Sequence, residues 1–413
     1  MMETDTPIGN VHAEGRTLKQ RARLVGLGAI GSAYAKPRQG RVPQDILLIR
    51  PDHLGDVLLL TPALHGLRAA LPNARLTLLL GPWSTAAVHG NEDVDAVETC
   101  PFPGFERKTK SNAIAPYRLL FDTAARLRER FDTAVVLRYD HWWGAWLAAA
   151  AGIPRRIGCR WPETAPFLTE RVPYEAGHHE ARQNARLLEA LAPGIEERLG
   201  PSHCAVQDED ASWAAERLSG GSGARWIAIH PGAGARVKQW SVDHWANVAT
   251  ALHEVSGVRV VLTGGPSEQA LTATIASRLS FDVLDLGGRT SFGQLAAIYR
   301  VCDLVLGSDS GPLHLAVAVG AKTVHLYGPV PAANFGPWGD PARNTVIVSP
   351  FACVPCDRLD WPADALPLHG CMAAIQPQQV VDAALRLLQP SPAIGAGSPR
   401  PVGPIPQASD RRR

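Results

Sequence analysis

The residues best placed to do chemistry lie in a segment that reads Ile46-Leu-Leu-Ile-Arg-Pro-Asp-His-Leu-Gly-Asp. An apolar run ends near Arg50, and a loop containing one glycine leads to Asp56. In open α/β sheets ligands collect at the carboxyl ends of strands, so Asp56 stands where a general base would stand. A carboxylate that only caps the following helix fits the local sequence equally well. Asp52 is a competing carboxylate, and His53 is a second candidate base.

A second segment, His230-Pro-Gly-Ala-Gly-Ala-Arg-Val-Lys-Gln-Trp, again follows an apolar run. Gly232 and Gly234 allow the backbone to approach phosphate oxygens. Lys238 could neutralise a diphosphate leaving group as charge builds on it. Glu268 follows another apolar run and a Gly-Gly turn, where it either complements a helix dipole or holds ribose hydroxyls. A solvated loop with incidental cations is the alternative for the Lys238 segment.

The third segment spans 304–320 and gives the strongest physical signal. A buried run meets Ser310 and Gly311, a proline suits the first helical position, and a glycine suits the helix end. The N–H groups of such a helix N-terminus favour a phosphate. Asp309 faces the same place and could accept hydrogen bonds from sugar hydroxyls. His314 lies one turn into the helix, where a structural role is the common one.

These segments need a scaffold that repeats strand, loop and helix. The expected strands are 46–49, 76–80, 134–137, 226–230, 259–263, 283–286, 304–307 and 323–327. The expected helices are 57–70, 116–130, 179–191, 242–255, 267–279, 291–301 and 312–319. This alternation predicts an α/β protein with parallel sheets and crossover helices.

The composition of its segments and the positions of glycine- and proline-rich stretches divide the chain into four parts. We expect a flexible basic leader at 1–43, an N-terminal α/β domain at 44–220, a C-terminal α/β domain at 221–390 and a disordered Pro/Gly-rich tail at 391–413. The Gly-Gly-Ser-Gly run at 220–223 marks the boundary between the domains, whose cleft would hold the ligand. The leader spells G-x-G-x-x-G at 26–31, but no strand stands before it, so we reject a dinucleotide site there.

The composition bounds the class of protein. Of 413 residues, 46% are hydrophobic, and no run reaches the roughly 18 to 20 apolar residues of a membrane-spanning helix. The first ten residues hold two acids and no apolar run, so we expect no secretory signal and a cytoplasmic protein. The net charge of +2 combines +4 in residues 1–43, +3 in 391–413 and −5 between them. That acidic middle disfavours nucleic-acid binding, whereas the basic ends suit either solubility or an anionic membrane surface.

At four places the sequence resembles glycosyltransferase family 9, the ADP-heptose:lipopolysaccharide heptosyltransferases. The matching stretches are R-P-D-H-L-G-D at 50–56, A-G-I-P-R-R-I-G at 151–158, H-P-G-A-G with K-Q-W at 230–240, and G-S-D-S-G-P-L-H at 307–314. One such motif would be weak, but four in the family's order are specific. The resemblance covers about residues 46–388.

The resemblance implies a GT-B fold, in which two Rossmann-like domains face each other across a cleft. It implies inverting transfer of a heptose from ADP-heptose to a lipid A-linked lipopolysaccharide core, without a cofactor or an essential metal. The acceptor would bind the N-terminal domain and the nucleotide sugar the C-terminal one. Peripheral contact with the inner face of the inner membrane would follow from a lipid-linked acceptor. The alternative keeps this fold and mechanism but uses a different nucleotide sugar or cell-surface glycan acceptor.

The family's functional residues carry over by position. Asp56 matches the proposed general base, and Lys238 matches the phosphate-contacting lysine. Glu268 matches the ribose-binding acid, and Asp309 the residue near the donor sugar. The full set of donor-binding predictions is His230, Gly232, Glu268, Asp309, Ser310, Gly311 and His314.

Two further groups stay open at this stage. Arg50, Arg107, Lys108 and Arg118 would suit an acceptor with acidic sugars or phosphates, although a solvated basic loop is the commoner explanation for the last three. Cys353, Cys356 and Cys371 form a cluster with one C-x-x-C spacing, which fits half of a structural zinc site. Free thiols or a disulfide are the alternatives, and we expect no catalytic metal.

Overall fold

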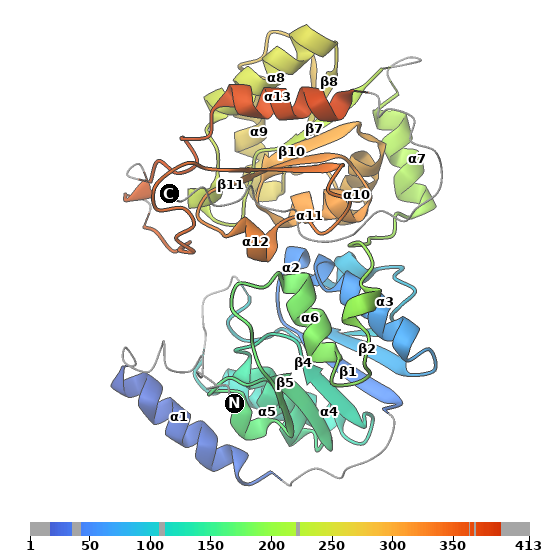
Figure 1. The fold of residues 1–413 in the computed structure, drawn as a ribbon, viewed down its shortest axis with the longest axis vertical. Helices are drawn as coiled ribbons and strands as arrows, with labels where there is room; N and C mark the ends of the chain where they lie inside the picture. Colours follow the sequence, from blue (N-terminus) through green and yellow to red (C-terminus); the bar gives the residue numbers. More distant parts are fainter. Residues whose placement is uncertain are drawn as a thin grey trace, which may run out of the picture.

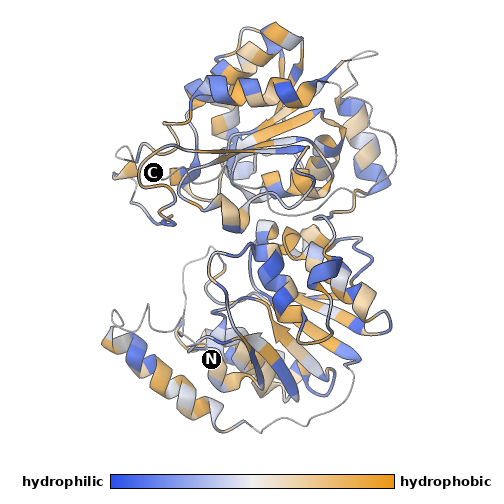
Figure 2. Cartoon of the chain, viewed as in Figure 1, coloured by the Kyte–Doolittle hydropathy of each residue, from blue (hydrophilic) through white to orange (hydrophobic). Residues whose placement is uncertain are grey.

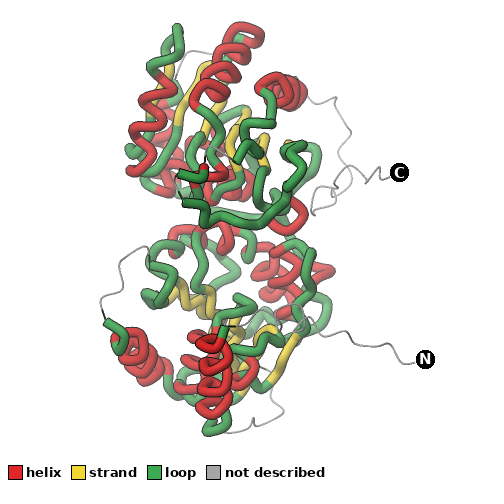
Figure 3. Tube along the Cα trace, turned by 90° about the vertical axis from the view of Figure 1, so that its left-hand side faces the viewer, coloured by secondary structure: helices red, strands yellow, loops and turns green. Residues whose placement is uncertain are grey.

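The computed structural model describes residues 17–34, 43–106, 112–219, 224–362, 364–366 and 369–389. Figure 1 shows two lobes, one above the other, each built on a six-stranded sheet. Figure 3 gives the same arrangement from the side, with helix ends and loops facing the space between the lobes. All strand pairs in both sheets are parallel.

The N-terminal lobe has the strand order β3-β2-β1-β4-β5-β6. Its strands are β1 (Asp45–Arg50), β2 (Arg75–Leu80), β3 (Ala96–Thr99), β4 (Thr133–Val136), β5 (Arg155–Cys159) and β6 (Glu170–Val172). Its helices are α2 (Leu54–Leu58), α3 (Thr61–Ala70), α4 (Ala115–Leu127), α5 (Trp142–Ala150) and α6 (Glu180–Leu188). Helices cover the sheet, so its central strands are buried and apolar, as Figure 2 shows.

The C-terminal lobe has the order β12-β11-β10-β7-β8-β9. Its strands are β7 (Trp226–His230), β8 (Arg259–Leu262), β9 (Val283–Asp285), β10 (Leu304–Ser308), β11 (Thr323–Tyr327) and β12 (Asn344–Val348). Its helices are α7 (Asp208–Arg217), α8 (Val242–Ser256), α9 (Gln269–Ala276), α10 (Phe292–Val301), α11 (Gly311–Ala318), α12 (Ala332–Phe335) and α13 (Pro377–Leu388).

Both sheets follow the order 3-2-1-4-5-6 when their own strands are counted along the chain. In such a sheet the crossovers run in opposite directions from the two central strands, which leaves a crevice at their carboxyl ends. The crevices therefore lie after β1 and β4 in one lobe and after β7 and β10 in the other. The motif segments that follow residues 50, 230 and 308 therefore lie at the crevices after β1, β7 and β10.

The expected strands and helices are present, with differences that have physical reasons. The helix expected at 57–70 is split into α2 and α3, because Pro62 stands in the first turn of a new helix. The strands β3, β5, β6 and β12 were not expected. They are short and contain charged or polar residues, since β3, β6 and β12 are edge strands of their sheets and β5 lies next to an edge.

Helix α1 (Leu18–Gly31) corrects the expectation of a flexible leader for the part of it that is described. Thr17 and Gln20 form a capping box at its start, and Leu27 is buried in the hydrophobic core beside Phe167. The G-x-G-x-x-G pattern lies inside this helix, not between a strand and a helix, in agreement with the rejection of a dinucleotide site. The glycine run at 220–223 and the tail at 391–413 fall outside the described residues. Helix α7 lies within the expected N-terminal domain of 44–220 but belongs to the C-terminal lobe (Figure 1), where the indole of Trp226 donates to the Leu218 carbonyl at 2.8 Å. The chain therefore enters the C-terminal lobe before the glycine run.

Two segments join the lobes across their interface. The indole of Trp338 donates a hydrogen bond to the Gly200 carbonyl at 3.0 Å, and it packs with Leu59 and Ala181. The imidazole of His179 lies 3.0 Å from the Gly336 carbonyl. These contacts hold the segment that follows α12 of the C-terminal lobe against the start of α6. None of the described helices combines the length and the apolar character needed to cross a membrane.

Candidate active site

A cleft of about 1080 Å³ opens between the lobes at the carboxyl ends of both sheets. The N-terminal lobe contributes the loop after β1 and the start of α2, and the C-terminal lobe contributes the loops after β7, β8 and β10. Eight residues predicted from the sequence line it together: Asp56, His230, Lys238, Glu268, Asp309, Ser310, Gly311 and His314. The fold thus gathers into one site residues that lie more than 250 positions apart in the chain.

Asp56 lies in the first turn of α2 and faces this cleft. It does not cap the helix, because His53 is the N-cap residue and no side chain makes a capping bond there. Among the described residues, nothing donates a hydrogen bond or forms an ion pair with the Asp56 carboxylate. Burial raises its pKa to about 6, with the charge of Asp52 adding to the rise and Arg50 opposing it. A carboxylate of that pKa is ionised at neutral pH and can accept a proton.

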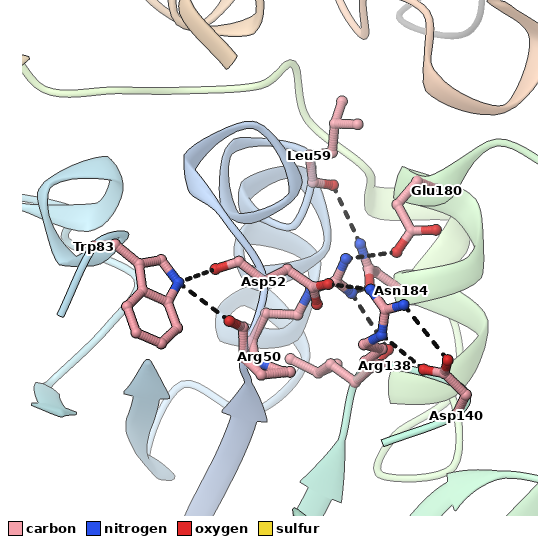
Figure 4. A network of polar contacts seen from close by, with 10 residues as sticks. Arg50, Asp52, Leu59, Trp83, Arg138, Asp140, Glu180 and Asn184 are labelled. Carbon is pink, nitrogen blue, oxygen red and sulfur yellow. Dashed lines mark hydrogen bonds and ion pairs between the residues drawn. The ribbon is translucent and has the colours of Figure 1, made fainter. Parts of the chain in front are cut away.

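Asp52, the competing carboxylate, is buried, and both of its oxygens form ion pairs within the N-terminal lobe. Its oxygens pair with Arg138 and, at 2.7 Å, with Arg50. Burial alone would raise the pKa of Asp52, but the two guanidinium groups outweigh it and lower that pKa. Figure 4 shows this network at close range, with the indole of Trp83 donating to the Asp52 carbonyl at 3.1 Å.

Arg50 is engaged by its neighbours in the N-terminal lobe, and its predicted contact with an acceptor stays a prediction. Its guanidinium is buried, pairs with Asp52 and with Glu180 at 2.7 Å, and donates to the Asn184 side chain at 2.9 Å (Figure 4). It lines a smaller pocket beside the cleft, not the cleft itself. Its geometry is that of a residue that holds the loop after β1 in place.

The two lobes touch where the first turns of α2 and α11 meet. A Cβ atom added at Gly55 would lie 3.2 Å from both the Gly311 Cα and the His314 Cδ2 atoms. A side chain at Gly55 would force Gly311 or His314 to shift. The glycine therefore brings Asp56 up to the N-terminus of α11.

Lys238 and Asp309 form an ion pair on the other wall, with 2.9 Å between Nζ and Oδ2. His314 approaches the second oxygen of Asp309 at 3.7 Å. Burial would raise the pKa of Asp309, but Lys238 and the nearby His314 outweigh it and hold that pKa at about 2. Asp309 is therefore anionic at any physiological pH, and it aims the ammonium group into the cleft.

The N-terminus of α11 carries unused hydrogen-bonding capacity. Ser310 is its N-cap residue, and its side chain makes no capping bond. The Ser310 hydroxyl and the His314 Nδ1 atom are buried, and neither has a partner within the described part of the chain. Buried polar atoms without partners are costly, so they indicate a place for a ligand. With the dipole of α11, the place suits an anion.

Glu268 reaches the cleft from the start of α9. Its carboxylate accepts from the Gly265 backbone N–H at 2.8 Å and lies 3.5 Å from the His230 imidazole. Burial lowers the pKa of His230 to about 4, so this imidazole is neutral. Gly232 lies outside the cleft lining, and a Cβ there would come within 1.8 Å of a Glu268 oxygen. Gly232 makes room for Glu268, and its predicted approach to a phosphate stays a prediction.

Other predicted residues either do not line the cleft or lie outside the described residues. Arg118 is exposed on α4 and pairs with Asp122 at 3.7 Å, while Arg107 and Lys108 lie outside the described residues. Cys353 and Cys356 are exposed free cysteines, and Cys371 is a buried one. Within the described ranges, no group of three or more His, Cys, Asp or Glu side chains is arranged to hold a metal ion.

Several functional candidates were missed. Arg138 follows the expected strand 134–137 directly, so its place at a strand end was a usable signal. Glu180 lies at the start of the helix expected at 179–191, and nothing in the local sequence indicated that it would pair with Arg50. Other lining residues that the sequence analysis missed come from segments without a motif, among them Trp83, Phe105, Phe292, Phe335 and Asp357.

Comparison with known proteins agrees with this architecture. A family model described as glycosyltransferase family 9 (heptosyltransferase) matches residues 121–362. A lipooligosaccharide heptosyltransferase 2 of Campylobacter jejuni is 29% identical over 174 residues, which are 41% of this chain and 53% of the relative; the chain thus matches about half the length of that relative. A lipopolysaccharide heptosyltransferase 2 of Escherichia coli K12 is 24% identical over 83% of this chain and 98% of its own.

The solved structure of the E. coli ADP-heptose lipopolysaccharide heptosyltransferase II superposes with a TM-score of 0.68 at 22% identity. The match covers 84% of this chain and 98% of the other. At that identity the likeness shows the fold, and the fold is GT-B.

Proposed function

Because this chain belongs to glycosyltransferase family 9, we propose that it transfers a heptose from ADP-heptose to a sugar of a lipid A-linked lipopolysaccharide core. The observation that carries the proposal is the meeting of an unpaired carboxylate, Asp56, with an anion-binding wall made by Lys238 and the N-terminus of α11. A sugar donor with a diphosphate needs the anion-binding wall. An acceptor that attacks through a hydroxyl group needs the carboxylate.

In the mechanism that we propose, Asp56 accepts the proton of an acceptor hydroxyl as the oxygen attacks the anomeric carbon. The C–O bond to the diphosphate breaks on the opposite face, so one displacement inverts the anomeric centre. Lys238 and the N-terminus of α11 stabilise the charge that develops on the diphosphate. Glu268 would hold the ribose hydroxyls, and Asp309 keeps Lys238 in place. We propose that these groups act without an essential metal.

The donor assignment has a direct test. We expect purified protein to release ADP from ADP-heptose in the presence of a heptose-deficient lipopolysaccharide acceptor, and to continue in EDTA. UDP- and GDP-sugars should give no comparable turnover. The stereochemistry of the product, read by NMR coupling at the new linkage, should be inverted. Turnover of another nucleotide sugar alone would overturn the heptose assignment, and loss of activity in EDTA would overturn metal independence.

We further propose that the enzyme works in the cytoplasm at the inner face of the inner membrane, held by what we call the α1–α4 face. This face consists of Leu18 and Val25 of α1, Ile114 beside α4, and Tyr117 and Phe121 of α4. Leu18 and Val25 are 85% and 75% exposed, and the three residues at α4 between 44% and 70%. Patches of exposed apolar and aromatic groups mark interaction sites.

Contacts and charge support a bilayer as the partner of this face. Trp146 of α5 lies between the two helices: its ring is 5.8 Å from Tyr117, and its indole donates to the Tyr34 hydroxyl, just after α1, at 2.8 Å. The sequence of α1 contains three Lys or Arg residues and no Asp or Glu. Cations beside exposed apolar and aromatic side chains are complementary to anionic headgroups.

A vesicle assay tests this contact. The protein should sediment with vesicles of phosphatidylethanolamine and phosphatidylglycerol and bind phosphatidylcholine vesicles more weakly. Val25→Asp should weaken binding to the anionic vesicles roughly tenfold or more, because it places a carboxylate against the headgroups. Val255→Asp on α8, also at an exposed position (67%), is the matched control and should bind as the wild type does. Equal losses in both variants, or self-association through this face, would contradict the proposal.

A further inference from the structure

A second, smaller pocket adjoins the active-site cleft. This side pocket has a volume of about 140 Å³. Asp56 and Phe335 line both cavities, so the two meet at the carboxylate that we assign as the base. Its other walls follow the carboxyl ends of β4 and β5, on the side of β1 that faces α6. The volume corresponds to roughly four to five water molecules, enough for one edge of a sugar unit.

Aromatic rings form one wall of the side pocket. The rings of Tyr139 and Tyr174 lie 4.7 Å apart at 31°, and Trp161 packs edge-on against Tyr139 at 4.9 Å. Both tyrosines are half-buried. Burial raises both of their pKa values, that of Tyr174 to about 12, so the phenols stay neutral donors. An aromatic wall with a polar tip suits a ligand that has both a C–H face and hydroxyl groups.

The charges around the side pocket disfavour an anion. Both cations are already neutralised: Arg50 pairs with Asp52 and Glu180, and Arg138 pairs with Asp52 and, at 2.6 Å, with Asp140. Four carboxylates, those of Asp52, Asp56, Asp140 and Glu180, thus surround two guanidinium groups. An incoming phosphate or carboxylate would find no unpaired cation and would be repelled. Sugar hydroxyls, in contrast, can donate to Glu180 and accept from the phenols.

We propose that the side pocket binds the acceptor sugar unit that bears the attacking hydroxyl, and that it selects a neutral, hydroxylated sugar over a phosphorylated or acidic one. The proposal rests on the proposed function. The acceptor sugar lies against Tyr139 and Tyr174 and directs its hydroxyl at Asp56 from the side opposite the donor. Phe335, from α12 of the C-terminal lobe, closes the pocket, so the subsite is complete only when the lobes are apposed.

The first test removes the aromatic wall. Tyr174→Ala should raise the acceptor KM roughly two- to tenfold and leave the donor KM unchanged, because only the acceptor meets this ring. Tyr174→Phe keeps the ring and should retain most of the acceptor affinity. Thermal melting checks that both variants fold. An unchanged acceptor KM in Tyr174→Ala, or a parallel loss of donor affinity, would overturn the assignment of this subsite.

The second test addresses the charge preference. Wild-type protein is given two deacylated core oligosaccharides that end in the same neutral sugar, one of them phosphorylated on that sugar. The neutral oligosaccharide should be the better acceptor. Asp140→Asn frees Arg138 from one of its two acidic partners and should improve the relative use of the phosphorylated acceptor roughly two- to fivefold. Equal use of both acceptors by the wild type would overturn the neutral-sugar preference.

Calorimetry separates failure of this proposal from failure of the proposed function. Binding of the neutral oligosaccharide to wild-type protein and to Tyr174→Ala is measured in the presence of ADP, without turnover. Weaker binding to Tyr174→Ala supports the subsite even if ADP-heptose proves not to be the donor. Equal binding overturns the subsite even if heptose transfer is observed.

Discussion

Asp56→Asn should reduce the transfer rate by roughly 10²- to 10⁴-fold, the contribution of a positioned general base. The amide has nearly the shape of the carboxylate but cannot accept the proton. The affinity for donor or ADP, measured by calorimetry, should be within about twofold of the wild type, because in our proposal the donor is held mainly by the other lobe. Asp56→Ala should behave in the same way.

The pH profile of the wild type follows from the state of the same group. Because burial and Asp52 raise the pKa of Asp56 to about 6, kcat/KM should fall as the pH drops through about 6. Asp52→Asn removes a negative neighbour, so the pKa of Asp56 should fall and this acidic limb should move to lower pH. An active Asp56→Asn enzyme, or an acidic limb that survives in it unchanged, would remove Asp56 from the role of base.

Much of the scaffold was predictable because its central strands are apolar and bounded by glycine-rich loops. The strands that carry the motifs, β1, β7 and β10, are buried almost throughout and gave a clear pattern. Helix α1 was not predictable in the same way. Its three glycines disfavour a helix, and it forms with a capping box and with Leu27 packed beside Phe167 in another part of the chain. Such tertiary support leaves no mark in the local sequence.

For the candidate site too, local features were predictable and contacts between distant residues were not. Asp56, Lys238 and Asp309 could be predicted as site residues from the sequence. Each follows the end of an apolar strand or precedes the start of a helix, and both features can be recognised locally. The local sequence could not decide between a base and a cap for Asp56. The structure excludes the cap, because His53 is the N-cap residue, and it shows Asp52 paired with two arginines from β1 and from the end of β4; Asp56 as the base is our proposal. Both are facts about residues that lie far apart in the chain.

Lys238→Met should lower kcat roughly 10²- to 10³-fold, the loss expected when one preorganised group that stabilises developing charge is removed. The same change leaves Asp309 as a buried carboxylate without its cation. The free energy of unfolding should therefore also fall by about 3 to 5 kcal/mol, the usual cost of breaking a buried ion pair. Denaturant titration and initial rates measure the two effects on one preparation.

The two effects can be separated by a second substitution. Lys238→Met combined with Asp309→Asn removes both charges of the pair, which is 2.9 Å apart in the wild type, so no buried charge is left uncompensated. Most of the lost stability should return, whereas the rate should stay low because the cation that meets the diphosphate is still missing. If the double variant regained the wild-type rate, Lys238 would serve only to neutralise Asp309, and the charge on the leaving group would have to be carried by the N-terminus of α11.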